Sequence, residues 1–376
     1  MKVVLIGPAF PLRGGIADFN EALATSLQNE GHEVIIYSFD YQYPSFLFPG
    51  TSQITEGINP ENLVIHPTLN SVNPISWHRT ASAIVFEKPD LVIIRYWIPF
   101  MAPALGTVAK KLRQKNIKVI AIADNIIPHE NRPGDSMLTK YFIKHCDGFI
   151  TMSRTVYDQL SRFTHTTNKL FLPHPIYNIF GERVAKADAR KNIGMDISEK
   201  LILFFGFIRA YKGLNLLIDA MADKRIRDRG VKLLVAGEFY DDKTPYLEKI
   251  KANGLSQSII LHTEFIDRKK VKDYFCAADM VVQPYLNATQ SGITQIAYYF
   301  GKPMLVTNVG GLAEIVADKR VGYVTEKKSS AIADAICDFY DYNREKEFSL
   351  NVDSDKEKFS WGNFIKGLIK LYDKIR

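Results

Sequence analysis

Two cations stand three residues apart, directly after an apolar run of the sequence. Arg209 and Lys212 lie in Gly206-Phe-Ile-Arg-Ala-Tyr-Lys-Gly, which follows the run 201–205. If that run is a β-strand, both side chains lie on the loop at its carboxyl end, where two positive charges can hold a diphosphate. Arg suits bidentate contact with phosphate oxygens, and Lys supplies a point charge. A solvated surface pair is the alternative, but a basic loop after a fully apolar strand favours anion binding.

A second candidate anion site follows the first apolar run. Gly14 and Gly15 end the segment that begins at Gly7, and Asp18 opens a helical pattern. Glycines let backbone amides approach an anion, and a helix start adds its unpaired N–H groups and positive dipole end. The segment is not the GxGxxG dinucleotide fingerprint. Phosphate binding and an ordinary strand-to-helix turn therefore both stay open.

A third candidate lies before a helix that ends at Gly301-Lys-Pro. The strand 280–283 leads into a polar loop, and Ser291 and Gly292 begin the helix. The amides of Ser291, Gly292 and Ile293 would point at an anion. A plain helix cap is the alternative.

Short β-branched runs alternate with segments of helical period, which is typical of parallel α/β layers. The predicted strands are Val3–Ile6, Val34–Tyr37, Leu91–Ile94, Lys118–Ala123, Gly148–Met152, Leu201–Phe205, Lys232–Ala236, Ile259–His262, Met280–Gln283, Met304–Thr307 and Gly322–Thr325. Two consecutive series of this kind predict two doubly wound domains. The stretch 41–73 shows neither period and is interpreted as a long loop or excursion.

The composition indicates a folded globular chain. Its 376 residues are 46% hydrophobic and 24% charged, which excludes collagen-like, low-complexity and disordered classes. The three cysteines lie far apart without zinc or disulfide spacing, and no signal peptide or membrane span is recognisable. We therefore expect a cytoplasmic protein without a metal site.

The formal net charge of +7 predicts anionic partners. No aromatic residues alternate with a basic stripe, so nucleic acid is not expected. The run Lys110-Lys-Leu-Arg-Gln-Lys could touch anionic lipid from the membrane surface. A solvated helix end is the alternative, because Lys and Arg are favoured in last turns.

Four motifs together resemble family 4 retaining glycosyltransferases of the GT-B fold, the group 1 glycosyl transferases. They are Gly206-Phe-Ile-Arg-Ala-Tyr-Lys-Gly, Gln290-Ser-Gly, Gly301-Lys-Pro and Asn308-Val-Gly-Gly-Leu-Ala-Glu, and with the helix from Trp361 their order matches over essentially the whole chain. The resemblance implies two facing Rossmann-like domains. Residues 1–178 would bind the acceptor, residues 179–360 would bind the donor, and a helix over 361–376 would cross back to the first domain.

The resemblance also implies sugar transfer from a UDP- or GDP-linked sugar, usually without a metal. Arg209 and Lys212 would neutralise the diphosphate as leaving group. Phe239 is a candidate to flank the base. The other implied donor contacts are Gly14, Gly15, Gln290, Ser291, Gly292, Ile293 and Glu314, of which Glu314 lies near the sugar.

Two departures from the family pattern change the expected site. Ala288 and Ile296 stand where relatives carry glutamates, so the ribose needs other contacts, with Gln295 or backbone groups as candidates. Asp124 replaces a sugar-contacting His of many relatives; it can accept from a sugar hydroxyl or take the acceptor's proton, with a turn cap as the alternative. His129 follows in a loop expected to face the cleft and is a further catalytic candidate.

No carboxylate nucleophile is evident, so front-face attack is the mechanistic hypothesis, with the leaving phosphate taking the acceptor's proton. The expected acceptor is a glycan or lipid-linked glycan in cell-surface polysaccharide or lipopolysaccharide assembly. A catalytically silent nucleotide-sugar binder stays open because of the missing glutamates. Another GT-B enzyme, such as a nucleotide-sugar epimerase, is a second alternative.

Overall fold

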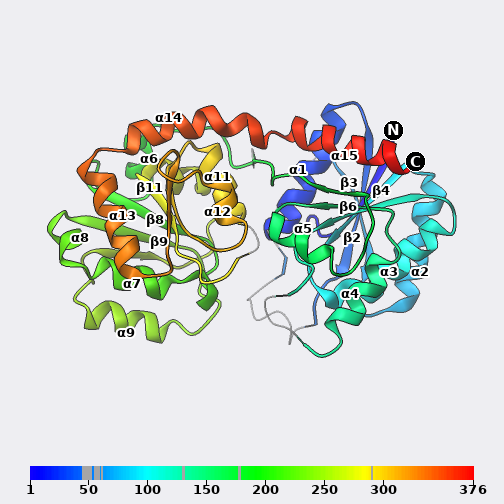
Figure 1. The fold of residues 1–376 in the computed structure, drawn as a ribbon, viewed down its shortest axis with the longest axis horizontal. Helices are drawn as coiled ribbons and strands as arrows, with labels where there is room; N and C mark the ends of the chain where they lie inside the picture. The colour runs from blue at the N-terminus through cyan, green and yellow to red at the C-terminus, as the bar shows by residue number, and fades with distance from the viewer. Residues whose placement is uncertain (45–52, 55–59, 61, 129–131, 177–178, 289–290) are drawn as a thin grey trace. The chain divides into compact units, whose positions relative to one another are not determined.

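The chain folds into two compact units. The computed structural model describes residues 1–44, 53–54, 60, 62–128, 132–176, 179–288 and 291–376. The first unit comprises Met1–Pro175 and Ser360–Arg376, and the second comprises Ile176–Phe359. In each unit a parallel sheet carries helices on both faces (Figure 1). The predicted class of two doubly wound α/β domains is confirmed.

The first unit is built on a seven-stranded parallel sheet in the order β3-β2-β1-β4-β5-β6-β7. The strands are β1 (Lys2–Ile6), β2 (Glu33–Tyr41), β3 (Val64–Asn70), β4 (Leu91–Tyr96), β5 (Lys118–Ala123), β6 (Gly148–Thr151) and β7 (Lys169–Phe171), and the helices are α1 (Gly15–Asn29), α2 (Pro74–Glu87), α3 (Ala102–Arg113), α4 (Asp135–Ile143), α5 (Arg154–Leu160) and α15 (Trp361–Ile375). The helices α2, α3 and α4 pack in series, whereas α15 contacts α1, β5, β6 and β7. The strand order reverses at β1, which makes its carboxyl end a topological switch point.

The second unit has a six-stranded parallel sheet in the order β10-β9-β8-β11-β12-β13. The strands are β8 (Lys200–Phe205), β9 (Val231–Ala236), β10 (Ile259–His262), β11 (Met280–Gln283), β12 (Met304–Thr307) and β13 (Gly322–Thr325), and the helices are α6 (Lys186–Asn192), α7 (Leu214–Met221), α8 (Lys224–Asp228), α9 (Thr244–Ala252), α10 (Val271–Ala277), α11 (Gly292–Tyr299), α12 (Leu312–Ile315), α13 (Ser329–Asp341) and α14 (Glu345–Asp355). Here the order reverses at β8.

The interpretation of residues 41–73 as a long loop or excursion is wrong for residues 64–70, and residues 45–52, 55–59 and 61 of that stretch lie outside the described residues. Residues 64–70 form β3, which pairs in parallel with β2 at the edge of the sheet. The apolar pattern is interrupted by Pro67 and by two further exposed positions, Val64 and Thr68, and an edge strand tolerates both kinds of interruption. Helix α2 follows at once, with Asn73 as its cap: the Asn73 side chain accepts a hydrogen bond from the Ile75 amide at 3.0 Å.

The central strands are buried on both faces, which explains their uninterrupted apolar sequences. In β4, Val92, Ile94 and Tyr96 join the core that packs under α2, α3 and α4. Because side chains alternate along a strand, Arg95 points to the opposite face. There its guanidinium carbon lies 3.8 Å from the ring centroid of Phe19 on α1.

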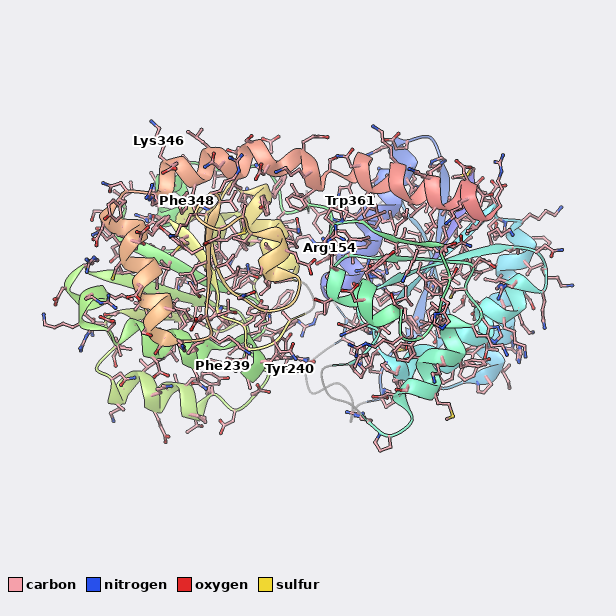
Figure 2. All side chains as sticks on the ribbon, in the orientation of Figure 1. Arg154, Phe239, Tyr240, Lys346, Phe348 and Trp361 are labelled. Atoms are coloured by element: carbon pink, nitrogen blue, oxygen red, sulfur yellow. The ribbon has the colours of Figure 1, made fainter. Side chains whose placement is uncertain are left out.

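The last helix, α15, packs on the first unit through aromatic side chains. Its N-cap Ser360 accepts a hydrogen bond from the Asn363 amide at 3.3 Å. Trp361, labelled in Figure 2, and Phe364 place their ring centroids 5.1 and 5.9 Å from that of Phe19. Across the described ranges, no helix combines the length and the apolarity that crossing a bilayer requires.

Candidate active site

The loops that follow β8, β9 and β11 are joined at the carboxyl edge of the second sheet. The Gly206 amide donates to Ala236 O at 2.9 Å, and the Leu286 amide donates to Tyr211 O at 2.7 Å. Because β8 lies between β9 and β11, this is the switch point at which doubly wound sheets bind ligands. Arg209 and Lys212 therefore belong to a loop that its two neighbours hold in place.

A glycine fixes how this loop returns to its helix. Gly213 has φ +70° and precedes α7. A Cβ atom at this position would lie 1.9 Å from Pro284 O, the backbone at the end of β11. Only glycine allows this approach, which sets Lys212 directly beside the β11 loop.

The two predicted cations lack a counter-charge within the described part of the chain. Neither Arg209 nor Lys212 forms an ion pair there. Burial lowers the pKa of Lys212 to about 7, and the charge of Arg209 adds to this effect. The Lys212 ammonium lies beside Gly206, 3.2 Å from the position that a Cβ atom on this glycine would occupy. This arrangement favours an anionic ligand, because an anion would restore the charged form of the lysine.

The start of α11, with Ser291, Gly292 and Ile293, lies beside the same loop. Ile293 also lies beside Gly206: its terminal methyl carbon is 3.4 Å from the position that a Cβ atom on Gly206 would occupy. Ser291 caps the helix, since its hydroxyl accepts from the Ile293 amide at 3.2 Å. The Ser291 hydroxyl and a bound anion would therefore compete for the Ile293 amide. The Ser291 hydroxyl also lies 3.4 Å from the Tyr285 hydroxyl.

The proposed ribose contact, Gln295, lies in the interior. Its side chain is fully buried on α11. Neither its amide nitrogen nor its oxygen has a hydrogen-bond partner among the described residues. Next to it, the Thr294 hydroxyl donates to Gln283 Oε1 at 3.2 Å. A contact between Gln295 and a ligand would therefore require the side chain to become exposed.

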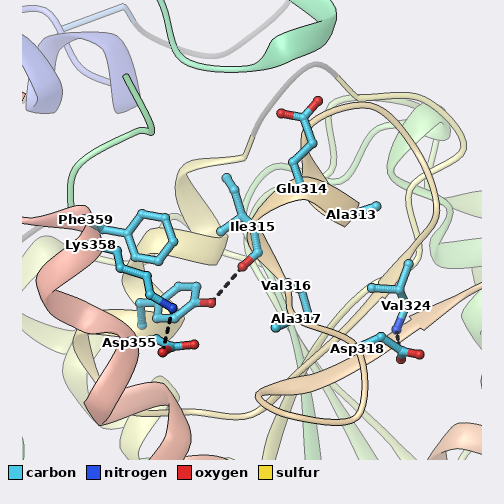
Figure 3. A pocket seen from close by; sticks show the side chains of 11 residues that line it. Ala313, Glu314, Ile315, Val316, Ala317, Asp318, Val324, Asp355, Lys358 and Phe359 are labelled. Carbon is cyan, nitrogen blue, oxygen red and sulfur yellow. Dashed lines mark hydrogen bonds and ion pairs between the residues drawn. The ribbon is translucent and has the colours of Figure 1, made fainter. Parts of the chain in front are cut away.

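Glu314 lies on α12 beside a cavity of about 530 Å³. The cavity is lined by Tyr298, Ala313, Glu314, Ile315, Val316, Ala317, Asp318, Val324, Asp355, Lys358 and Phe359. The Lys358 ammonium and Asp355 pair at 2.8 Å, and the Tyr298 hydroxyl donates to Ile315 O at 2.8 Å. Figure 3 shows the exposed Glu314 carboxylate directed away from this ion pair.

In the first unit, Gly14 and Gly15 form the N-terminus of α1. Gly14 is the N-cap with φ +118°, and α1 begins at Gly15, three residues earlier than the helical pattern at Asp18 predicts. A Cβ on Gly14 would meet no atom within 4 Å, so the backbone is open on that side. The predicted strand-to-helix turn is therefore present at the switch point of the first sheet.

Asp124 follows β5 and is held by a partner that the sequence does not reveal. Its Oδ2 and Oδ1 accept from Arg95 Nε and Nη2, both at 2.6 Å. The side chains of Arg95 and Asp124 are 3% and 7% exposed. Asp124 is thus half of a buried bidentate ion pair.

Two predicted residues, His129 and Gln290, lie outside the described residues, and the site is built without them. Within the described ranges, no three His, Cys, Asp or Glu side chains gather as a metal ion would require.

Three residues that contact the predicted site residues were not predicted from the sequence. Arg95 is the one charge inside the apolar run 91–96, and a charge in a buried strand is itself a signal of a partner. Tyr285 follows β11, and its ring lies 5.8 Å from the Lys212 ammonium. The Tyr240 ring packs 3.9 Å from the Arg209 guanidinium carbon.

Comparison with known families divides the chain as the two sheets do. Residues 13–171 match the model described as Glycosyltransferase Family 4, and residues 199–341 match the model described as Glycosyl transferases group 1. An uncharacterised glycosyltransferase of Methanocaldococcus jannaschii is 24% identical over 396 aligned residues, covering 99% of this chain and 98% of that protein.

Solved structures share the fold over the whole chain. The sucrose-phosphate synthase from Thermosynechococcus elongatus superposes with a TM-score of 0.77 at 18% identity, covering 100% of this chain and 99% of that one. The Anabaena protein HepE in complex with UDP gives a TM-score of 0.76 at 14% identity, with 100% of both chains covered.

Proposed function

This chain belongs to the family 4, or group 1, glycosyltransferases of the GT-B fold, and from that premise we propose that it transfers a sugar from a nucleoside diphosphate sugar to a glycan or lipid-linked glycan. We propose a UDP- or GDP-linked donor, because a solved relative of the same fold is described as a complex with UDP. The proposed setting, cell-surface polysaccharide or lipopolysaccharide assembly, rests on family analogy.

One observation carries the donor site: Arg209 and Lys212 share a loop at the switch point of the second sheet without a counter-charge among the described residues. A diphosphate supplies the missing negative charge, and it is the leaving group of the proposed reaction. The two cations would then do the work that a metal ion does in other transferases, so we propose catalysis without a metal.

We propose transfer with retention by front-face attack. The bond between the sugar's anomeric carbon and the β-phosphate oxygen breaks, and the acceptor oxygen bonds to that carbon from the same side. The acceptor's proton passes to the departing phosphate, while Arg209 and Lys212 stabilise the developing negative charge. No carboxylate nucleophile is needed, which suits a chain with Ala288 and Ile296 at the family's glutamate positions.

A thermal-shift screen of UDP, GDP, ADP and their sugars tests the donor assignment. Binding of one nucleotide to the folded state must raise the apparent Tm. Arg209→Ala and Lys212→Ala should abolish most of that shift, whereas Lys224→Ala on exposed α8 should leave it unchanged. If no nucleotide shifts the wild-type chain, the donor site is wrongly assigned.

A hydrolysis assay separates the enzyme from a silent binder, which the missing glutamates keep as an alternative. Slow release of free sugar from the bound donor, or transfer to any acceptor, shows catalysis. Interconversion of two nucleotide sugars without an acceptor would instead indicate the epimerase alternative.

We also propose peripheral contact with the anionic inner face of the membrane. The last turn of α3 carries Lys110, Lys111 and Arg113. Arg113 is partly neutralised, because its Nε pairs with Asp147 at 2.8 Å. Flotation with vesicles that contain anionic lipid should carry the protein, and Lys110→Ala with Lys111→Ala should weaken it. Equal flotation with neutral vesicles would contradict the contact.

A further inference from the structure

The loop after β9 lies against the side chain of Arg209. The Tyr240 ring centroid is 3.9 Å from the guanidinium carbon, a cation–π stacking distance. Phe207 supports this ring edge-on, with centroids 5.4 Å apart and planes at 70°. Figure 2 labels Tyr240 and its neighbour Phe239 on this loop. Asp241 and Asp242 of the same loop are exposed, whereas the Tyr240 ring is partly buried.

Backbone hydrogen bonds fix the two loops on both sides of this contact. The Ile208 amide donates to Glu238 O at 2.8 Å, and the Tyr240 amide donates to Ile208 O at 2.9 Å. The Ala210 amide donates to Asp241 Oδ2 at 2.6 Å. Both chain neighbours of Arg209 are therefore bonded to the loop that carries Tyr240. The backbone hydrogen bonds between the two loops therefore hold Tyr240 next to Arg209.

The stacking leaves the reactive edge of the guanidinium available. An arginine side chain has several free torsions, and an ordered ring against its plane removes much of that freedom. The N–H donors lie in the guanidinium plane, so a ring on the face does not block bidentate contact with phosphate oxygens. Arg209 forms no ion pair with a carboxylate among the described residues.

We propose that Tyr240 is a positioning residue that holds Arg209 ready for the β-phosphate of the donor, with Asp241 fixing the backbone beside it. This inference rests on the proposed function, because it needs the diphosphate site at Arg209. It differs from the expectation that aromatic residues of this loop flank the base. A base-stacking ring would affect every nucleotide equally, whereas a ring that positions Arg209 affects those with a second phosphate.

Calorimetric affinities for UDP and UMP separate these roles, with GDP and GMP as the pair if the uridine nucleotides do not bind. Tyr240→Leu should weaken UDP binding about three- to tenfold and UMP binding less than twofold. Tyr240→Phe, which keeps the ring, should restore the preference for UDP. Tyr342→Leu is the matched control: its ring lies 5.3 Å from the Arg344 guanidinium carbon elsewhere in the same unit. It should change neither affinity.

Arg209→Ala makes the outcomes distinguishable. It should weaken UDP binding about ten- to hundredfold and, combined with Tyr240→Leu, add little further loss. If Arg209→Ala weakens UDP but Tyr240→Leu does not, or if Tyr240→Leu weakens UDP and UMP equally, the positioning role is wrong and the donor site stands. If Arg209→Ala leaves UDP binding unchanged, or if neither nucleotide pair binds the wild-type chain, the proposed function fails and the inference fails with it.

Discussion

Arg95 and Asp124 form a bidentate ion pair at the carboxyl edge of the first sheet, with both N–O distances at 2.6 Å. The Phe19 ring covers the guanidinium, and both charges are almost fully buried. The family resemblance places Asp124 where many relatives carry a sugar-contacting histidine. The ion pair gives it a structural role that competes with the hypothesis that it takes the acceptor's proton. The two roles predict different results for the same substitution.

Asp124→Asn should destabilise the first unit by about 3–5 kcal/mol, because it leaves the Arg95 charge buried without a counter-charge. Replacing both residues, as Arg95→Met with Asp124→Leu, should cost much less than the single change. All three tryptophans, Trp77, Trp97 and Trp361, belong to the first unit, so tryptophan fluorescence during urea unfolding reports its stability.

Glu33→Gln is the control for this prediction, since Glu33 belongs to the same unit, pairs with Lys2 on the surface and should cost less than about 1 kcal/mol. An Asp124→Asn protein with wild-type urea stability and no transferase activity would favour the proton-accepting role instead.

The affinity for a diphosphate should fall as the pH rises above neutrality. In the free protein the pKa of Lys212 is lowered to about 7 by burial and then by Arg209, so the lysine loses its proton above that pH. A bound diphosphate favours the charged form, so binding takes up a proton and weakens by at most about tenfold per pH unit between pH 7.5 and 9. Calorimetry with UDP in buffers of different ionisation enthalpy measures both effects.

Lys212→Arg provides the comparison, because a guanidinium stays charged throughout this range and should give a flat profile of affinity against pH.

The lowered pKa of Lys212 has a second consequence, for the stability of the free protein. The unfolded chain keeps this proton up to about 10.5, so the contribution of Lys212 to stability increases between pH 7 and 10.5. Lys212→Met should lack that increase, and a wild-type UDP affinity that does not change with pH would refute the assignment.

The strands and the loops that carry the candidate anion sites could be predicted from the sequence because their signals are local. Strands buried on both faces need continuous apolar runs, and the loop with Arg209 and Lys212 directly follows one of them. Edge strand β3 was not predicted, because Pro67 and exposed positions interrupt its apolar pattern. A strand that pairs on one side only has no need of a continuous run.

The partners of the site residues could not be predicted because they arise from packing between distant segments. Arg95 lies on β4 and Asp124 directly follows β5, and the β4–β5 register brings them together. Tyr240 reaches Arg209 because the loops after β8 and β9 are joined. The position of Gln295 in the sequence motif suggested a ligand contact. Its side chain is fully buried because of how α11 lies in the unit, and the sequence does not reveal that burial.

Gly213→Ala should lower the Tm and weaken diphosphate binding together. The new Cβ would lie 1.9 Å from Pro284 O, which is backbone, so either the loop with Lys212 or the end of β11 must move. The positive φ adds roughly 1 kcal/mol of conformational cost. Differential scanning fluorimetry with and without UDP measures both losses. Gly230→Ala is the matched control, because Gly230 has φ +65° but no atom within 4 Å of an added Cβ. Equal effects of the two changes would show that the close approach does not matter.

Phe364→Ala should cost the first unit about 3–5 kcal/mol, the usual range for removing a buried aromatic side chain. Phe364 is 3% exposed on α15, and its ring meets the ring of Phe19, which in turn covers Arg95. The loss should therefore exceed that of the exposed Lys370→Ala on the same helix, which should stay within about 0.5 kcal/mol. Urea unfolding followed by tryptophan fluorescence measures both variants. A cost below about 1 kcal/mol for Phe364→Ala would show that α15 contributes little to the first unit and that the stack over Arg95 stands without it.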